Sequence, residues 1–207
     1  MPLQNRVDPL GRVQAAPARG LFTGNRGVIH DPATKTLLAR RWTTKAWIIC
    51  TLAHPRGGRR EPMGRNAPSG RAGWTELFFL DEATALAAGH RPCFYCRRAA
   101  ARAFADVFAG GGFSAPEIDA ALHLQRHAAG AALPALGGDQ IDALPDGAMV
   151  LAAGEVLALR GGRALPWSFD GYGRARALPR AAFLITPPAT VAALASGFAP
   201  VWHNSAS

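Results

Sequence analysis

Short apolar runs alternate with polar turns in the first part of the chain, which is the pattern of β-structure rather than of long helices. Residues 1–20 are polar and interrupted by glycine and proline, so we expect them to be irregular. The segment 56–73 is rich in Gly, Pro and Arg and predicts a long loop. The strands that this pattern predicts are 27–30, 36–42, 45–52 and 75–80, with a turn at 31–35.

Helices are predicted after the last of these strands. Asp81 can accept hydrogen bonds from the unpaired amides of a first helical turn, and Gly89 suits the positive φ that often follows a last turn. Further along, Ser114 can cap another helix, with Glu117 completing a capping box. The helical segments expected are therefore 82–88, 97–108 and one that begins after residue 114.

The pattern changes near residue 133, where the chain becomes rich in turns. The pairs Ala153-Gly154 and Gly161-Gly162 separate short apolar runs and predict tight hairpin turns. The elements expected here are strands 149–151, 156–159, 163–169 and 182–186 and a short helix at 189–195. The whole pattern predicts an α+β fold, with N-terminal antiparallel strands, then helices, then a small C-terminal β-meander. We expect two parts, 1–132 and 133–207, the second packed on the first.

Charge points to an anionic partner. The 207 residues include 23 Lys and Arg against 14 Asp and Glu, which gives a net charge of +9. Almost all of the positively charged residues are arginines. Guanidinium groups match phosphate geometry, so a nucleic acid is the partner that this charge favours; the simpler alternative is a biased base composition of the gene. The first residues lack the apolar stretch of a secretory signal, and no run approaches the roughly 20 apolar residues of a membrane span. We therefore expect a cytoplasmic protein without a membrane partner.

Cys93 and Cys96 form a C-x2-C pair, the spacing with which two thiolates bind one metal ion from a tight turn. The chain has 3 cysteines, too few for a disulfide framework, and the pair follows a predicted helix rather than a strand, so a metal is favoured over a redox motif. The candidates for further ligands are Cys50 with His54, the pair His123 and His127 if both lie on one helical face, and His90. A simpler interpretation exists for each candidate: Cys50 as a buried core cysteine, and each histidine as a residue without a ligand role.

The segment 75–97 predicts a strand ending in paired aromatic residues and an acidic, alanine-rich helix, followed by A-A-G-H-R-P-C-F-Y-C-R over 87–97. This pattern resembles the second half of the N-terminal zinc domain of the Ada family, the methyl-phosphotriester DNA repair proteins. The resemblance covers about residues 45–100 and implies a Zn²⁺ ion bound by Cys50, His54, Cys93 and Cys96, with His54 in place of the family's second cysteine. The loop between the two ligand pairs is longer here than in the family.

In the Ada family the first cysteine of the site accepts a methyl group from the DNA backbone, a role that would fall on Cys50. A neutral imidazole in place of one thiolate removes one unit of negative charge and makes the remaining sulfurs weaker nucleophiles. A structural clamp is therefore favoured over methyl transfer. No nucleophile elbow, paired-carboxylate motif or dinucleotide fingerprint occurs in the sequence, so no other catalytic residue is assigned.

A zinc clamp would bring two groups of arginines to one face. They are Arg56, Arg59 and Arg60 from the long loop, and Arg91, Arg97 and Arg98 around the cysteine pair. We predict that they contact phosphates without reading the base sequence, which makes a zinc protein that binds the nucleic-acid backbone the leading hypothesis. One alternative is a purely structural zinc with a small-molecule or protein ligand elsewhere. Another is a zinc-dependent nuclease-like or methyl-acceptor enzyme.

Overall fold

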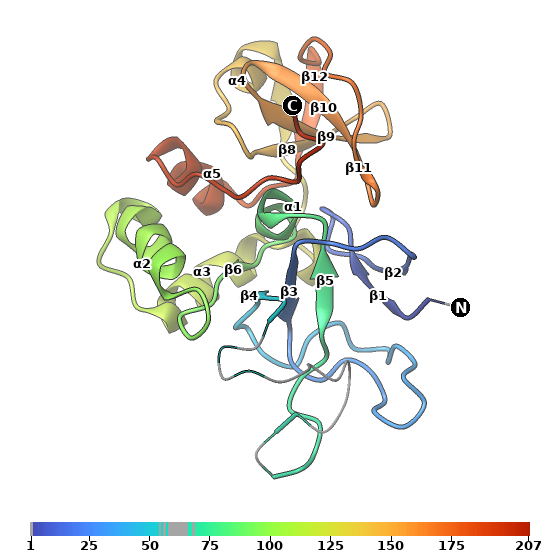
Figure 1. Ribbon diagram of the computed structural model, residues 1–207. Helices are drawn as coiled ribbons and strands as arrows, with labels where there is room; N and C mark the ends of the chain where they lie inside the picture. The colour runs from blue at the N-terminus through green and yellow to red at the C-terminus, as the bar shows by residue number, and fades with distance from the viewer. Residues whose placement is uncertain (1, 54, 56, 58–65, 68) are drawn as a thin grey trace.

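The computed structural model describes residues 2–53, 55, 57, 66–67 and 69–207. Within this part the chain forms two six-stranded sheets and five α-helices, so the predicted α+β class is confirmed. In Figure 1 one sheet occupies the lower half of the molecule and the other the upper half, with the short helix α1 (Glu82–Ala87) between them. None of the helices in the described part is long and apolar enough to cross a membrane.

The first sheet is mixed rather than wholly antiparallel. Its strand order is β2-β1-β5-β3-β4-β6, and the pairs β1–β5 and β4–β6 are parallel. The strands are β1 (Gln4–Val7), β2 (Val13–Ala15), β3 (Phe22–Asn25), β4 (Ile48–Thr51), β5 (Leu77–Phe79) and β6 (Arg91–Pro92). Pro92 is tolerated because β6 is an edge strand, where a missing N–H leaves no ladder bond unmade.

Two predictions for the N-terminal segment are wrong. Residues 1–20, expected to be irregular, contain β1 and β2. The strands expected at 27–30 and 36–42 are reduced to a single bridge between His30 and Leu37. Side chains instead bind backbone groups that hydrogen bonds between β-strands would use. Thr75 Oγ1 accepts hydrogen bonds from the N–H groups of Ile29 and His30. The Arg41 guanidinium donates to carbonyls of its own loop.

The second sheet is antiparallel throughout, in the order β11-β10-β9-β8-β12-β7. The strands are β7 (Ala135–Gly137), β8 (Met149–Ala152), β9 (Glu155–Arg160), β10 (Arg163–Ser168), β11 (Gly171–Tyr172) and β12 (Ala181–Leu184). The predicted meander β8-β9-β10 is present. Its turn residues Ala153, Gly154, Gly161 and Gly162 all have positive φ, as two-residue turns matching the strand twist require.

Helices α2 (Arg98–Val107), α3 (Ala115–Gln125) and α5 (Pro188–Ala195) pack together beside the first sheet, and α4 (Gly138–Asp142) lies against the second. The predicted capping box is present: the Ser114 N–H donates to Glu117 Oε2 over 2.8 Å. Residue 133 separates the two sheets in sequence. Leu194 and Phe198 nevertheless belong to the core of the first sheet, so the C-terminal segment joins both parts.

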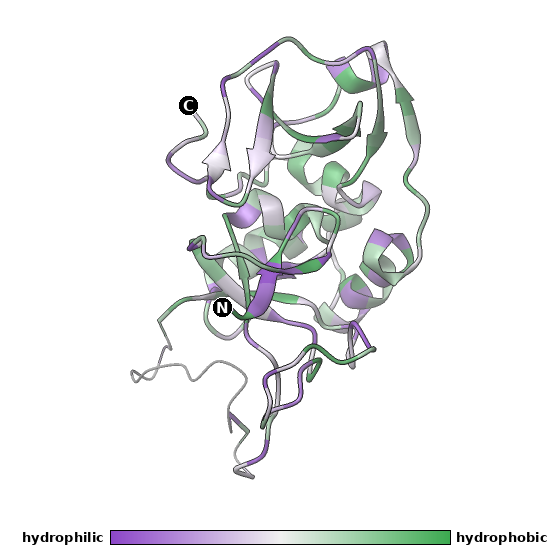
Figure 2. Ribbon diagram, turned by 90° about the vertical axis from the view of Figure 1, so that its right-hand side faces the viewer, coloured by the Kyte–Doolittle hydropathy of each residue, from purple (hydrophilic) through white to green (hydrophobic). Residues whose placement is uncertain are grey.

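Helix α1 is buried along its whole length, and two of the three hydrophobic clusters in the described residues meet on it. Ala85 and Leu86 pack in the core of the first sheet, whereas Ala83 and Ala87 pack with Met149 in the core of the second. Figure 2 shows hydrophobic ribbon running through this central region. Because three of these four helix residues are alanines, both sheets can approach the helix closely.

The N-cap residue Asp81 connects α1 to the C-terminal half. Its Oδ1 accepts hydrogen bonds from the N–H and hydroxyl of Thr84, at 2.9 and 2.7 Å. Its Oδ2 accepts from the Tyr172 hydroxyl at 2.8 Å and from the His203 N–H at 3.0 Å. One fully buried carboxylate therefore caps a helix, holds the second sheet and holds the tail.

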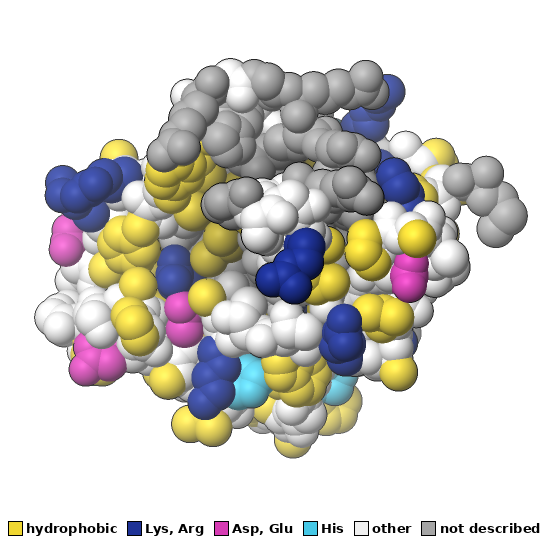
Figure 3. All heavy atoms as spheres, turned by 90° about the horizontal axis from the view of Figure 1, so that it is seen from below, with side chains coloured by type: hydrophobic (Ala, Val, Ile, Leu, Met, Phe, Trp, Pro, Cys, Tyr) yellow, Lys and Arg dark blue, Asp and Glu magenta, His cyan; other side chains and the backbone are white. Residues whose placement is uncertain are grey.

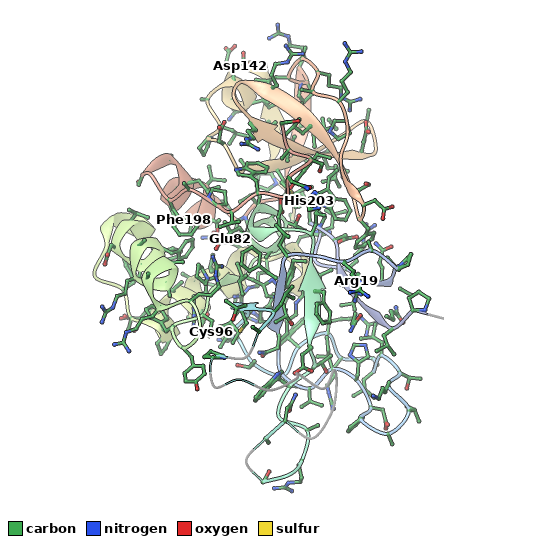
Figure 4. The ribbon with its side chains drawn as sticks, viewed as in Figure 1. Arg19, Glu82, Cys96, Asp142, Phe198 and His203 are labelled. Carbon is green, nitrogen blue, oxygen red and sulfur yellow. The ribbon has the colours of Figure 1, made fainter. Side chains whose placement is uncertain are left out.

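Glu82, the next residue, also connects α1 to other parts of the chain. Its Oε2 accepts from the Val201 N–H at 3.0 Å, and its Oε1 forms an ion pair with Arg97 Nη1. The Arg97 guanidinium also lies over the Phe22 ring, with Cζ 4.4 Å from the ring centroid. Figure 4 shows Glu82, Phe198 and His203 gathered around α1.

We expect Asp81→Ala to reduce the free energy of unfolding by about 3 kcal/mol, because it leaves a helix N-terminus and a buried hydroxyl without their acceptor. Asp106→Ala, an exposed acidic residue on α2, is the matched control and should change it by less than about 0.5 kcal/mol. Urea denaturation of both variants measures the difference. Equal stability of the two would show that the Asp81 carboxylate does not join the two halves.

Candidate metal centre

The parallel pairing of β4 and β6 places Cys93 beside Cys50. The Arg91 N–H donates to the Trp47 carbonyl at 3.1 Å, and the Cys93 N–H donates to the Ile49 carbonyl at 3.0 Å. Cys93 is thus hydrogen-bonded to the residue that precedes Cys50 on β4. The pairing brings together two cysteines that lie far apart in the sequence.

The end of α1 and a tight turn set the position of the other sulfur atoms. Gly89 follows α1 with a φ of +82°, as predicted, and the chain then enters β6. After β6 the backbone turns, and the Arg97 N–H donates to the Cys93 carbonyl at 2.9 Å just before α2 begins. Within this turn the Tyr95 N–H points to Cys93 Sγ, 3.4 Å away. Figure 4 shows Cys96 next to β4 and near the start of α2.

Cys50, Cys93 and Cys96 could hold a metal ion. Their sulfur atoms all lie within 4.8 Å of one another, and this is the one such group among the residues that the structure describes. Cys50 and Cys93 are buried and Cys96 is partly exposed. Three converging thiolates suit a soft or borderline cation such as Zn²⁺, whose thiolate sites are typically tetrahedral.

The pKa values of Cys50 and Cys93 are shifted in opposite directions. Contacts with the Cys50 and Cys96 side chains, and with the N–H groups of Cys96 and Tyr95, lower the pKa of Cys93. Contacts with the Cys93 and Cys96 side chains raise the pKa of Cys50, to which burial adds. A metal cation would take the place of protons on these thiols, so metal binding should release them.

A cavity of about 190 Å³ adjoins the three cysteines. Asn25, Ile48, Trp74 and Tyr95 complete its lining. Trp74 is fixed at its edge by a hydrogen bond of 2.8 Å from its indole N–H to Glu76 Oε1. No sequence motif places Asn25 or Trp74 at this site, because both reach the cysteines only through the folding of β3 and of the segment before β5.

Two of the candidate further ligands, His54 and His90, are not among the residues that the structure describes at the three cysteines. His54 lies outside the described residues. His90 is fully buried between rings, with its centroid 5.2 Å from that of Trp47 and 4.6 Å from that of Phe79. Its Nε2 accepts a hydrogen bond from Arg26 Nε at 3.2 Å, so His90 serves the packing of the core.

His123 and His127 do not form the predicted helical pair. Helix α3 ends at Gln125, and Arg126 has the extended conformation of a C-cap, so His127 lies in the following short 3₁₀ turn. The His123 ring packs edge-on against Trp42, and His127 Nδ1 lies 3.0 Å from the Ala131 carbonyl. The condition on which this alternative depended, that both histidines lie on one helical face, is therefore not met.

The predicted phosphate-binding arginines differ in their exposure and in their ion pairs. Arg91 is buried and forms a two-point ion pair with Asp119, at 2.9 and 2.7 Å. Arg97 is paired with Glu82. Arg98 is exposed at the start of α2. Arg56, Arg59 and Arg60 lie outside the described residues.

Two further arginines, Arg26 and Arg126, are buried on the ring of Trp47. Their Cζ atoms lie 3.9 and 4.5 Å from its centroid. Arg126 donates to the carbonyls of Gly89 and Lys45, which fixes the end of α1 to the segment before β4. Burial, and then the charge of other arginines, lowers the pKa of each to about 9. Arginine is seldom buried, so the sequence alone does not predict that Arg26 and Arg126 lie in the core.

A comparison of the chain with protein-family models, curated proteins and solved structures finds no significant match. The Ada-type resemblance therefore stays a prediction that rests on the residues quoted for it.

The burial of His90 predicts a pH dependence of stability. Burial, followed by the charges of Arg26 and Arg126, holds the pKa of His90 well below its usual value of 6.5. The unfolded chain takes up the proton first, so stability is lost as the pH falls below about 6.5, by up to about 1.4 kcal/mol per pH unit. Urea denaturation between pH 7 and 5 should show a smaller slope for His90→Gln than for the wild type. His127→Gln, with a partly exposed histidine in the turn after α3, is the control, and a slope equal in all three proteins would contradict the argument.

Proposed function

We propose that Cys50, Cys93 and Cys96 bind one Zn²⁺ ion, and that this ion fixes the turn after β6 to β4. The observation that carries the proposal is the convergence of three sulfur atoms within 4.8 Å from two separate segments. The Tyr95 N–H directed at Cys93 Sγ adds support, because a thiolate that accepts a backbone hydrogen bond is stabilised in its charged, metal-binding form.

His54 is the fourth ligand that we propose, from the C-x3-H spacing after Cys50. Four protein ligands without an open position are typical of structural zinc sites. Methyl transfer as in the Ada family is less well supported, because Cys50 is only 7% exposed and a bulky phosphotriester must reach the sulfur that accepts the methyl group.

Metal analysis of the purified protein tests the site. We expect one equivalent of zinc in the wild type and in His123→Gln, and much less than one in Cys50→Ser, Cys93→Ser and Cys96→Ser, because loss of one of so few ligands weakens binding by several kcal/mol. His54→Ala tests the fourth position separately. Full zinc content in all three cysteine variants would contradict the proposal.

A nucleic acid is the partner that we propose for the surface beside this site. Arg98 and Arg102 are exposed one turn apart on the first half of α2, directly after the cysteine turn, and the chain carries a net charge of +9. Arg91 and Arg97 are not included, because each already has a carboxylate partner. In Figure 3 the Lys and Arg side chains of the lower face are separated by hydrophobic and acidic ones, so contacts on that face would be few.

A salt titration of DNA binding checks this partner. Binding should weaken linearly with the logarithm of salt concentration, and Arg98→Gln with Arg102→Gln should reduce the slope by about 2. Arg163→Gln with Arg180→Gln removes the same charge from exposed positions at the start of β10 and just before β12 and serves as the control. No binding at about 50 mM salt, or equal losses in both double variants, would reject a nucleic-acid surface at α2.

A further inference from the structure

A second cavity, of about 300 Å³, lies on the side of the first sheet where β1 and β2 turn. Three segments contribute to its wall: Gly11 and Arg12 in the β1–β2 turn, Leu37 and Arg41 in the loop before β4, and His127 in the turn after α3. A volume of this size is at the lower end of the range for small-molecule pockets. We name it the cationic pocket.

The polar side chains of the cationic pocket favour an anion. Arg12 and Arg41 are exposed at its rim, and its described lining includes no Asp or Glu. Arg41 Nη1 is held by the Ala39 carbonyl at 3.0 Å, which fixes the direction of the guanidinium. His127 Nδ1 lies 3.0 Å from the Ala131 carbonyl, which can only accept, so Nδ1 donates there and the neutral ring has no second N–H to offer an anion.

A buried guanidinium lies directly behind this wall. Arg26 Nη1 donates to the Gly11 carbonyl at 2.8 Å, whereas the buried Arg26 Nη2 has no hydrogen-bond partner. A Cβ atom at Gly11 would lie 3.4 Å from that Nη2 and 2.6 Å from Ala128 Cβ. Gly11 therefore lies between the pocket and the buried charge, and a side chain at this position would collide with Ala128.

The charge behind the wall is not balanced within the core. Arg26 is fully buried, and Arg126 is buried against the same Trp47 ring. Asp8 is the carboxylate that acts on Arg26, and Asp119, which is paired with Arg91, is the one that acts on Arg126. This group therefore holds three buried arginines against two buried carboxylates. An anion in front of Gly11 would be attracted by buried and rim arginines together, in a region where burial weakens screening.

The remaining wall is apolar, with Leu10, Val13 and Leu37. We propose that the cationic pocket binds a small organic anion, a phosphate monoester or carboxylate that carries an apolar group about the size of a ring. The charged group contacts Arg12 and Arg41, and the apolar group packs on the aliphatic wall. This site is separate from the three cysteines and does not depend on their metal.

Titration calorimetry of the full chain with phenyl phosphate, benzoate, inorganic phosphate and phenol tests the proposal. We expect saturable one-to-one binding of phenyl phosphate or benzoate, weaker binding of inorganic phosphate and none of uncharged phenol. Which of the two organic anions binds more tightly identifies the charged group. Arg12→Gln and Arg41→Gln should each weaken the preferred anion about tenfold.

Arg180→Gln, with the same loss of charge on an exposed side chain just before β12, should leave affinity unchanged. Zinc content should be equal in all these proteins, which separates a failure here from a failure of the metal site. The proposal is overturned if neither organic anion saturates a single site, if inorganic phosphate binds as tightly as both, or if Arg180→Gln weakens binding as much as Arg12→Gln.

Discussion

Helix α1 is enclosed by two of the three hydrophobic clusters in the described part of the chain, and this enclosure decides the arrangement of the two sheets around it. Every residue of the helix is buried, so neither sheet can move away without exposing it to water. At its first turn the carboxylates of Asp81 and Glu82 hold the second sheet and the C-terminal tail. At its last turn Gly89 directs the chain into β6. One short helix therefore couples the association of the two sheets to the position of Cys93.

The candidate metal centre follows from this geometry. Because β6 pairs with β4, the cysteine turn lies against a strand of the first sheet, and Arg126 ties the end of α1 to the segment before that strand. A metal ion on Cys50, Cys93 and Cys96 would add a cross-link between segments that are already hydrogen-bonded. This agrees with a structural role, since the sulfur atoms converge without a large rearrangement.

Features set by neighbouring residues could be predicted from the sequence. The cap at Asp81, the positive φ of Gly89 and the capping box at Ser114 all depend on local backbone needs, and all are present. The closeness of Cys50 to the C-x2-C pair was one of several alternatives, because spacing alone does not show which strands pair. The ion pairs of Arg91 and Arg97 could not be predicted, since Asp119 and Glu82 become their partners only in the fold.

The central claim is that three thiolates share one zinc ion, and X-ray absorption at the zinc edge of the purified protein tests it most directly. We predict about three sulfur neighbours at about 2.3 Å and one lighter neighbour, nitrogen or oxygen, at about 2.0 Å. A coordination shell of nitrogen and oxygen alone, or no more than one sulfur, would contradict the account.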